Sequence, residues 1–531
     1  MNELQMPWLE ACILTPLIGA VVLTRMQDRY QARRWCVYIS GLTFIFAFTE
    51  FIDFVLQGAI HANDAFHLTK RLFGQEWFTI DQFSAPLLPL MALMYFLTSL
   101  TTLRTKVRRF SFASTLFAEA ITLALYSCEG DVPWLIAILL ALGCIPPYLE
   151  MKSRGKPTRV FVIHQAAFLV CLILGCALIT WEGDKEVHSA FAVSPLILAV
   201  LIRSGMAPFH CWITDMFENT TFGTALLFAT RAGGAYVAFR LVLPNSPDWV
   251  LSWMGIVSLF TAVYAAGMSL VQKDSRRFFC YLFLSHSALV LVGMETLHPN
   301  GMTGALCVWI SVVLSLGGFG LALRALESRR GRVQLSEYQG LYDHMPTLAV
   351  CFLLTGLASV GFPGTIGFIG IELIVDCVVE EYPIVGAAVV IAAALNGIAV
   401  VHAYFMIFTG TRHTNSVFPL QIGIRERYTM LVLTFLIIAG GIVPQPGVNS
   451  RYKAAQKLLS EHEERTGHKH GDGNLKHHDD QDNKMHKVKD DQDQDDEKKD
   501  DVEEREQKKA KENADAPKPE KKVEADSADK D

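Results

Sequence analysis

Ionisable side chains interrupt several long apolar stretches of this 531-residue chain. The stretch RSGMAPFHCWITD (residues 203–215) places Arg203, His210 and Asp215 in, or directly after, a run of apolar residues. A charged side chain at the centre of a membrane helix costs about 2.5 kcal/mol or more on insertion scales, so such residues indicate an ion pathway or a buried partner. By this criterion the candidates for an ion pathway are Glu119, Arg203, Arg231, His286, Glu372, His210, Asp215 and His402.

The residue types limit what each candidate does. A buried lysine can release its proton because desolvation lowers its pKa, whereas a guanidinium stays charged. All lysines of the first 450 residues lie between the apolar stretches, at Lys70, Lys106, Lys152, Lys156, Lys185 and Lys273. We therefore expect Arg203 and Arg231 to act as fixed charges, anion clamps or gates, with Glu119 as the partner of Arg203.

A proton path through the chain would depend on carboxylates, histidines and water. The residues available for it are Glu119, His164, His210, His286, Glu372, Asp376 and His402. Each of them also fits a structural role as a satisfied or interfacial group, and His210 and Asp215 are placed to cap or anchor the interruption near the membrane surface.

Composition indicates the class of protein that holds these residues. The chain is 51% hydrophobic and 19% charged, and residues 451–531 carry 25 acidic and 19 basic residues, which accounts for the net charge of −6. The remainder is neutral and apolar, as in an all-α polytopic membrane protein. We expect the charged tail to be disordered and its histidines not to bind metal, because its composition cannot bury a core and its histidines lack ligand spacing.

Several function classes are excluded by the motifs. The eleven cysteines are scattered singly, and we find no phosphate-binding loop, nucleophile elbow, metal-ligand spacing, or flavin, haem or quinone signature. We therefore expect no cofactor, no bound metal and no nucleic-acid partner, and any redox chemistry would belong to other chains.

A spanning helix needs about 20 mostly apolar residues, and we expect about fourteen of them. Loops after the first, third, fifth, ninth and eleventh are basic, so the positive-inside rule makes those loops cytoplasmic and puts both termini on the other side. The expected helices begin near Trp8, Trp35, Phe83, Phe112, Val132, Val160, Val193, Phe222, Val250, Phe278, Gly301, Thr347, Pro383 and Tyr428.

Glycine and proline interrupt the seventh and twelfth expected helices, at RSGMAPFHCW and GLASVGFPGTIGFIGIE. The breaks lie five helices apart, so two five-helix units would have opposite orientations, and paired breaks in inverted repeats are a pointer to an ion path. Ordinary kinking is the alternative. The predicted divisions are helices 1–3 (1–110), a first repeat (111–245), a second repeat (246–412), a last helix (413–450) and the disordered tail (451–531).

Six motifs together resemble a known family, the antiporter-like membrane subunits of respiratory NADH:quinone oxidoreductase, which are related to multisubunit sodium/proton antiporters of the Mrp type. The nearest type within it is chain M, also called chain 4. The motifs run in the family's order from Phe78 to about Gly447: FTIDQFSAPLL, RSGMAPFHCWITD, ALLFATRAGGAYVAFR, VQKDSRRFFCYLFLSHSALVLVG, LSEYQGLYDHMP and LASVGFPGTIGFIGIE.

The resemblance implies fourteen helices with inverted repeats and proton translocation coupled to redox chemistry in partner chains. Glu119 matches the family's helix-four glutamate, Gln272 and His286 match in the tenth-helix region, and Arg203 occupies the place of the helix-seven lysine. Arg231 lies one residue away from the place of the helix-eight lysine. Three positions depart from the family pattern because they are apolar: Ala141, Val312 and Ile371.

We therefore expect a proton-translocating, antiporter-like subunit of an NADH:quinone oxidoreductase-type complex, without redox chemistry of its own. It would lie in a bacterial inner membrane with other membrane subunits, and redox subunits elsewhere in the complex. Two alternatives stay open: a non-conducting structural or anchor subunit that kept the fold, and the membrane subunit of a cation/proton antiporter or an inorganic-carbon uptake system.

Overall fold

The computed structural model describes residues 2–183, 188–379, 382–410 and 421–466. It divides into Met1–His468 and Lys469–Asp531, of which the first unit is described here. Asp184, Lys185 and Glu186 of one acidic loop, Glu380 and Glu381 of another, and the tail beyond Thr466 with its histidines lie outside the described residues.

The N-terminal part combines helices with a small sheet. In the sheet the strand order is β1-β2-β3, with β1 and β2 parallel and β2 and β3 antiparallel. The elements are β1 (Asn2–Glu3), α1 (Trp8–Arg25), α2 (Arg29–Gln57), β2 (His61–Asn63), α3 (Leu68–Phe73), β3 (Ile80–Asp81), α4 (Leu87–Leu100) and the 3₁₀ helix η1 (Arg104–Arg109).

The next segment begins at a capped helix, where the Ser111 side chain accepts a hydrogen bond from the Ser114 amide. It contains two interrupted spans and a π-helical turn, η2. Its elements are α5 (Phe112–Tyr126), α6 (Pro133–Leu142), α7 (Ile145–Ser153), α8 (Arg159–Glu182), α9 (Ala190–Ser204), α10 (Cys211–Asn219), α11 (Phe222–Thr230), α12 (Gly233–Val237), η2 (Ala238–Val242) and η3 (Leu243–Asn245).

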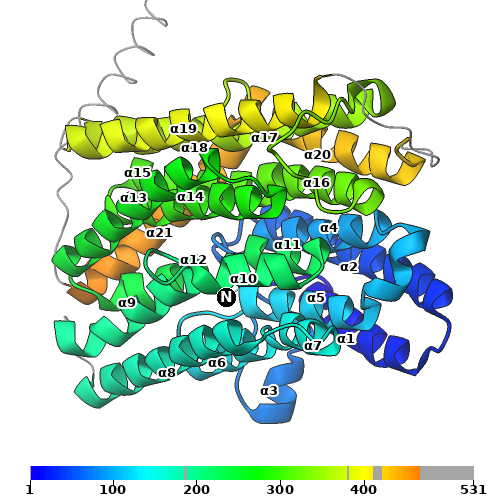
Figure 1. Cartoon of the computed structure of the whole chain (residues 1–531). Coiled ribbons are helices and arrows are strands. Elements are labelled where there is room, and N and C mark those ends of the chain that lie inside the picture. The colour runs from blue at the N-terminus through cyan, green and yellow to red at the C-terminus, as the bar shows by residue number, and fades with distance from the viewer. Residues whose placement is uncertain (1, 184–187, 380–381, 411–420, 467–531) are drawn as a thin grey trace, which may run out of the picture. The chain divides into compact units, whose positions relative to one another are not determined.

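The last segment has a second π-helical turn, η4, inside its third span. In Figure 1 its helices run alongside those of the preceding segment. Its elements are α13 (Asp248–Leu270), α14 (Ser275–Glu295), α15 (Pro299–Ser311), η4 (Val312–Leu316), α16 (Gly317–Arg330), η5 (Tyr342–His344), α17 (Pro346–Val360), α18 (Ile366–Val379), α19 (Pro383–Phe408), α20 (Ile424–Ile442) and α21 (Gln445–Thr466).

The all-helical membrane architecture is confirmed. In the described part of the chain, nine helices are long and apolar enough to span a bilayer, and four shorter apolar helices and α20 accompany them. Each expected start lies within six residues of an observed helix start. Large apolar side chains such as Ile163, Ile173 and Trp181 stay exposed along α8, which fits contact with lipid. The count of fourteen spans stays a prediction.

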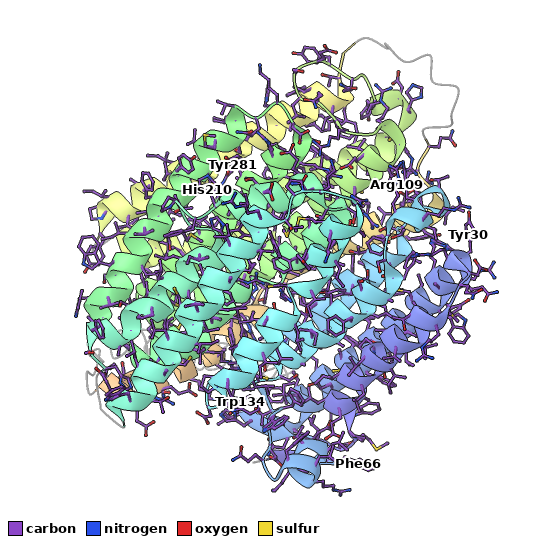
Figure 2. The ribbon with its side chains drawn as sticks, turned by 60° about the horizontal axis from the view of Figure 1, so that its bottom comes forward. Tyr30, Phe66, Arg109, Trp134, His210 and Tyr281 are labelled. Carbon is purple, nitrogen blue, oxygen red and sulfur yellow. The ribbon has the colours of Figure 1, made fainter. Side chains whose placement is uncertain are left out.

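Figure 2 shows where residues near the two ends of the helices lie. Tyr30 and Arg109 lie at one end of α2, and Phe66 and Trp134 lie toward the opposite end. Arg109 is the last residue of η1, which also carries Lys106 and Arg108. The positive-inside rule uses such basic loops to orient a membrane protein, and the orientation of this chain stays a prediction.

The two expected breaks are present and resemble each other. The first helix of each broken pair, α9 or α17, has 15 residues and ends at a left-handed glycine, Gly205 (φ 71°) or Gly361 (φ 92°). A proline follows each glycine closely, at Pro208 and Pro363, which prevents a regular continuation. The first turn is buried at Gly205 and Met206, whereas Phe362, Pro363 and Gly364 of the second break are exposed.

The expected start of the disordered tail at residue 451 is wrong. Residues 451–466 belong to α21, which packs against α15 and η3. The composition of the whole tail concealed a short apolar stripe, because Ala454, Ala455, Leu458 and Leu459 fall on one helical face and are buried. Arg451 also donates to the Phe83 carbonyl at 3.0 Å, which ties α21 to the start of α4.

A buried ion pair joins the first and second segments. Arg240 Nη1 and Nη2 donate to the two Asp81 oxygens at 2.8 and 2.9 Å, and the guanidinium stacks 4.8 Å from the Phe83 ring. Burial alone would raise the pKa of Asp81, but the charge and hydrogen bonds of Arg240 outweigh burial and hold that pKa well below its usual range. Lys457 of α21 adds a second cation 3.8 Å from Asp81.

We predict that Asp81→Ala lowers the free energy of unfolding by about 3–5 kcal/mol, because it leaves the Arg240 charge buried without its partner. The matched control is Glu218→Ala, which breaks the more exposed pair with Arg277 and should cost no more than about 1 kcal/mol. Thermal unfolding of the two variants in detergent measures the difference. Equal losses would contradict the role of the buried pair.

The same pair predicts a pH dependence. Because the folded pKa of Asp81 lies below its ordinary value of 3.8, the stabilisation is complete above about pH 5 and is lost only as the pH falls below that ordinary value. The difference in unfolding temperature between wild type and Asp81→Asn should therefore stay constant from about pH 5 to 8 and shrink in stronger acid.

Candidate functional site

Glu119 lies completely buried in α5, one turn before Thr122, which hydrogen-bonds Tyr95 of α4 at 3.0 Å. The Ser40 hydroxyl of α2 donates to Glu119 Oε1 at 3.0 Å. The second oxygen, Oε2, has no hydrogen-bond partner among the described residues. A buried polar atom ordinarily takes part in a hydrogen bond, so this oxygen is the one atom of the carboxyl that can accept a further donor.

Arg203 lies in the last turn of α9, where the negative end of the helix dipole favours a cation. Its Nη1 donates to Gln165 Oε1 of α8 at 2.6 Å, and the guanidinium stacks 4.3 Å from the Phe228 ring centroid. Trp212, from the other side of the helix break, lies 5.8 Å away and donates its indole N–H to the Ile202 carbonyl. The two helices on either side of the break, α9 and α10, therefore both contribute to the surroundings of the buried Arg203 guanidinium.

The expected ion pair between Glu119 and Arg203 is wrong. Among the described residues Glu119 is held by Ser40, and Arg203 is held by Gln165. The amide of Gln165 satisfies the guanidinium from the neighbouring α8, so a carboxylate is not required for that hydrogen bond. The charge of Arg203 stays uncompensated by an ion pair.

Arg231 caps the C-terminal end of α11, directly before Ala232, which adopts a left-handed conformation. It is 1% exposed, and its guanidinium lies 4.7 Å from the same Phe228 ring that contacts Arg203. Its Nε and Nη2 atoms have no hydrogen-bond partner among the described residues. Tyr126 donates its hydroxyl hydrogen to the Arg231 carbonyl and so fixes the backbone there.

The other candidates do not join this group. His286 is buried in α14, where its Nδ1 pairs with the Leu282 carbonyl at 2.7 Å. His210 lies edge-on to Tyr264, with ring centroids 5.6 Å apart, and Asp215 accepts a hydrogen bond from Asn219 at 2.9 Å, so both are engaged near the helix break. Glu372 and His402 are exposed on the outer faces of α18 and α19.

Further residues that the sequence singled out have ordinary surroundings. His164 is half-buried and bonds the Val160 carbonyl through Nδ1 at 2.8 Å, Asp376 is exposed one turn after Glu372, and Gln272 donates to the Met268 carbonyl at 3.0 Å. Among the Asp, Glu, Lys, Arg and His residues described in α13–α19, Arg276 at the start of α14 and His286 are buried.

Sequence reasoning missed the neutral partners of the site, Gln165 and Ser40, and the Asp81–Arg240 pair. A signal existed for Gln165, which is a polar residue inside the apolar run VFVIHQAAFLVCLIL. Asp81 lies in the motif FTIDQFSAPLL and Arg240 in the motif ALLFATRAGGAYVAFR. The two residues are far apart in the sequence, so their pairing becomes visible only in the folded structure. Within the described ranges no three His, Cys, Asp or Glu side chains gather as metal ligands.

Comparison with known proteins shows which family and which relatives this chain is similar to. Residues 164–396 match the family described as "NADH:quinone oxidoreductase/Mrp antiporter, TM". The chain is 27% identical over 411 residues to the chloroplastic NAD(P)H-quinone oxidoreductase chain 4 of Manihot esculenta, covering 70% of this chain and 79% of that protein. Over residues 164–396 the chain is therefore similar to the NADH:quinone oxidoreductase/Mrp antiporter family.

Solved structures of lower identity share the fold of this chain. A chain of respiratory complex I from Thermus thermophilus with bound NADH superposes with a TM-score of 0.75 at 20% identity, covering 86% of this chain and 99% of that one. A chain of the Mrp complex from Dietzia sp. DQ12-45-1b gives a TM-score of 0.68 at 15% identity, covering 86% and 98%. The chain is thus an integral membrane protein whose fold is shared beyond the segment that matches the family.

We predict that Gln165→Leu lowers the free energy of unfolding by about 1.5–3 kcal/mol, because the Arg203 charge loses its hydrogen-bond acceptor. The matched variant Gln165→Glu keeps an acceptor in the same place and supplies a negative charge, so it should be at least as stable as wild type. Thermal unfolding in detergent orders the three proteins. A Gln165→Leu protein as stable as wild type would show that Arg203 does not depend on this residue.

Proposed function

We propose that this antiporter-like subunit translocates protons as part of an NADH:quinone oxidoreductase-type complex, and that Glu119 carries the proton. The observation that supports the proposal is the completely buried Glu119 carboxyl, which has one oxygen held by Ser40 and the other without a partner among the described residues. A carboxyl in such a place can take up and release a proton without moving its own helix.

The arginines support the path without carrying protons. A guanidinium does not release its proton at any relevant pH, so Arg203 and Arg231 act as fixed positive charges. The field of a fixed cation favours the ionised form of a nearby carboxylate and opposes the approach of a proton. Gln165 and Phe228 keep the two guanidiniums in place, which makes that electrostatic barrier permanent.

The partners and sidedness follow from the same proposal. Relatives and structural neighbours carry the names of multisubunit assemblies, a chloroplastic quinone oxidoreductase, respiratory complex I and an Mrp complex. We infer that this subunit works with other membrane subunits and with redox subunits elsewhere, in a bacterial inner membrane. The basic end with η1 would face the cytoplasm, and both termini the opposite side.

A flux measurement tests the role of Glu119. The intact complex is reconstituted in vesicles, and proton uptake is followed with a pH-sensitive dye while the redox reaction runs. We predict that Glu119→Gln lowers the protons moved per electron by at least half. Glu372→Gln is the matched control, because it makes the same chemical change on the exposed face of α18 and should leave the ratio within about a tenth of wild type, as expected for a surface substitution.

The non-conducting alternative has one structural observation in its favour. Among the described residues of α13–α19 no Asp or Glu is fully buried, and the positions Ala141, Val312 and Ile371 are apolar. If Glu119→Gln left the proton ratio unchanged in an assembled complex, the scaffold function would replace the translocating one.

A further inference from the structure

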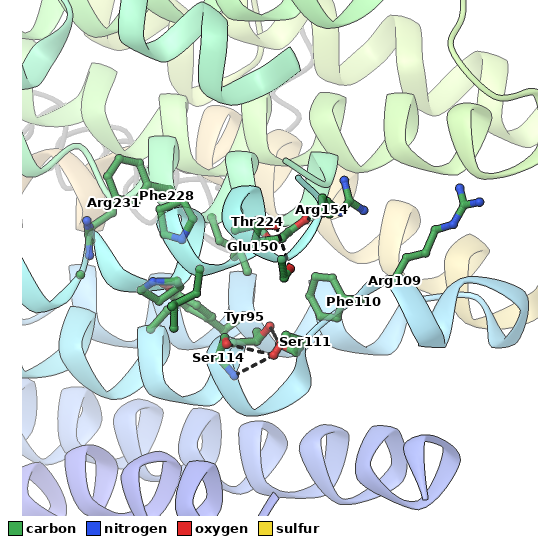
Figure 3. Close-up of a pocket in the computed structure, with 18 of the residues that line it drawn as sticks. Tyr95, Arg109, Phe110, Ser111, Ser114, Glu150, Arg154, Thr224, Phe228 and Arg231 are labelled. Atoms are coloured by element: carbon green, nitrogen blue, oxygen red, sulfur yellow. Dashed lines mark hydrogen bonds and ion pairs between the residues drawn. The ribbon is translucent and has the colours of Figure 1, made fainter. Parts of the chain in front are cut away.

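A cavity of about 440 Å³ lies between the start of α5, α7 and α11. Figure 3 shows Arg231 beside Phe228 at one side of it and Arg109 and Arg154 toward the other. Its charged lining residues are five arginines and one carboxylate: Arg29, Arg108, Arg109, Arg154, Arg231 and Glu150. The lining is therefore strongly cationic.

The single carboxylate is already engaged. Glu150 Oε1 accepts a hydrogen bond from the Thr221 amide at 2.6 Å and lies 3.5 Å from Arg154 Nε. Glu150 Oε2 accepts hydrogen bonds from the Thr221 and Thr224 hydroxyls. Glu150 thus fixes the N-terminal end of α11 and neutralises Arg154, which leaves Arg231 without a counter-charge in the cavity.

Arg231 presents the free edge of its guanidinium. The two nitrogens without partners, Nε and Nη2, form the side of the fork that binds two oxygens of one carboxylate or phosphate group. The third nitrogen, Nη1, is pressed against Gly143, where an added Cβ would lie 2.1 Å from it. Gly143 therefore serves as a cradle that lets the guanidinium reach this position.

The buried charge needs compensation. Neither Arg203 nor Arg231 forms an ion pair with a carboxylate in the described part of the chain, although both stack on Phe228. Burying one such charge without a partner costs several kcal/mol, and two adjacent cations also repel each other. A bound anion on the free edge of Arg231 would remove both penalties.

We propose that this cavity is a binding site for an oxyanion group, which accepts a bidentate pair of hydrogen bonds from Arg231 Nε–H and Nη2–H. The exposed arginines Arg108 and Arg109 at the rim attract the anion, and Tyr95, Phe110 and Phe228 supply apolar walls. The fork geometry selects a group with two oxygens on one edge, such as phosphate or a carboxylate, over a halide. The site does not depend on whether Glu119 carries protons.

Binding of inorganic phosphate to the purified full chain in detergent tests the site. In equilibrium dialysis with radiolabelled phosphate, we predict saturable binding to wild type that weakens at least tenfold in Arg231→Gln. Arg231→Lys keeps the charge without the fork and should weaken binding about threefold to tenfold. Arg25→Gln removes one exposed arginine outside the cavity and is the matched control, with wild-type affinity.

If Arg231→Gln does not fold, a second variant still tests the proposal. Gly143→Ala keeps Arg231 but displaces its guanidinium, because the new methyl group overlaps Nη1. It should weaken phosphate binding at least fivefold. Unchanged binding in both Arg231→Lys and Gly143→Ala would overturn the proposal.

The oxyanion has two sources, a free anion and the headgroup of a phospholipid, and native mass spectrometry separates them. A phospholipid retained by wild type and lost in Arg231→Gln, with phosphate competing for it, assigns the site to a lipid headgroup. Saturable phosphate binding by lipid-free protein assigns it to a free anion. Wild type that neither binds phosphate nor retains a phospholipid contradicts the proposal.

Discussion

The structure depends on holding guanidinium charge inside an apolar bundle. Arg203 and Arg231 lie on one aromatic ring, Phe228, and the first is held by an amide where a carboxylate was expected. A neutral partner satisfies the hydrogen bonds and leaves the charge itself free to act on its surroundings. That arrangement explains why the helix break after Ser204 is needed, because the turn at Gly205 lets Trp212 fold back over Arg203.

In the proposed function, the Glu119 carboxyl and the guanidiniums of Arg203 and Arg231 have different roles. Glu119 is held from α2 by the hydroxyl of Ser40 and forms no ion pair among the described residues, so under the proposed function it can exchange a proton that a tight ion pair would hold back. Asp81 and Arg240, in contrast, form a direct ion pair, which joins the N-terminal segment to the segment that follows it. The described part of the chain thus contains buried charged residues of two kinds, a closed ion pair at Asp81 and Arg240 and the charges of Arg203 and Arg231, which form no ion pair.

Much of the fold was predictable from the sequence. Apolar runs located the helices, and glycine with proline located both breaks, because these signals are local. Of the site residues, only the charged ones, Glu119, Arg203 and Arg231, could be predicted from the sequence. Gln165 and Ser40 carry no charge to mark them, and the pairing of Glu119 depends on which helix packs beside α5. The tail boundary failed because the four apolar residues of α21 were outweighed by the charged sequence that follows them.

The central claim is that the Glu119 carboxyl gains and loses a proton during turnover while the arginines stay charged. Infrared difference spectroscopy of the intact complex during redox turnover observes this most directly. The account predicts a protonated-carboxyl stretching band that shifts in heavy water and is missing in Glu119→Gln. A difference spectrum that is the same in wild type and Glu119→Gln would contradict it.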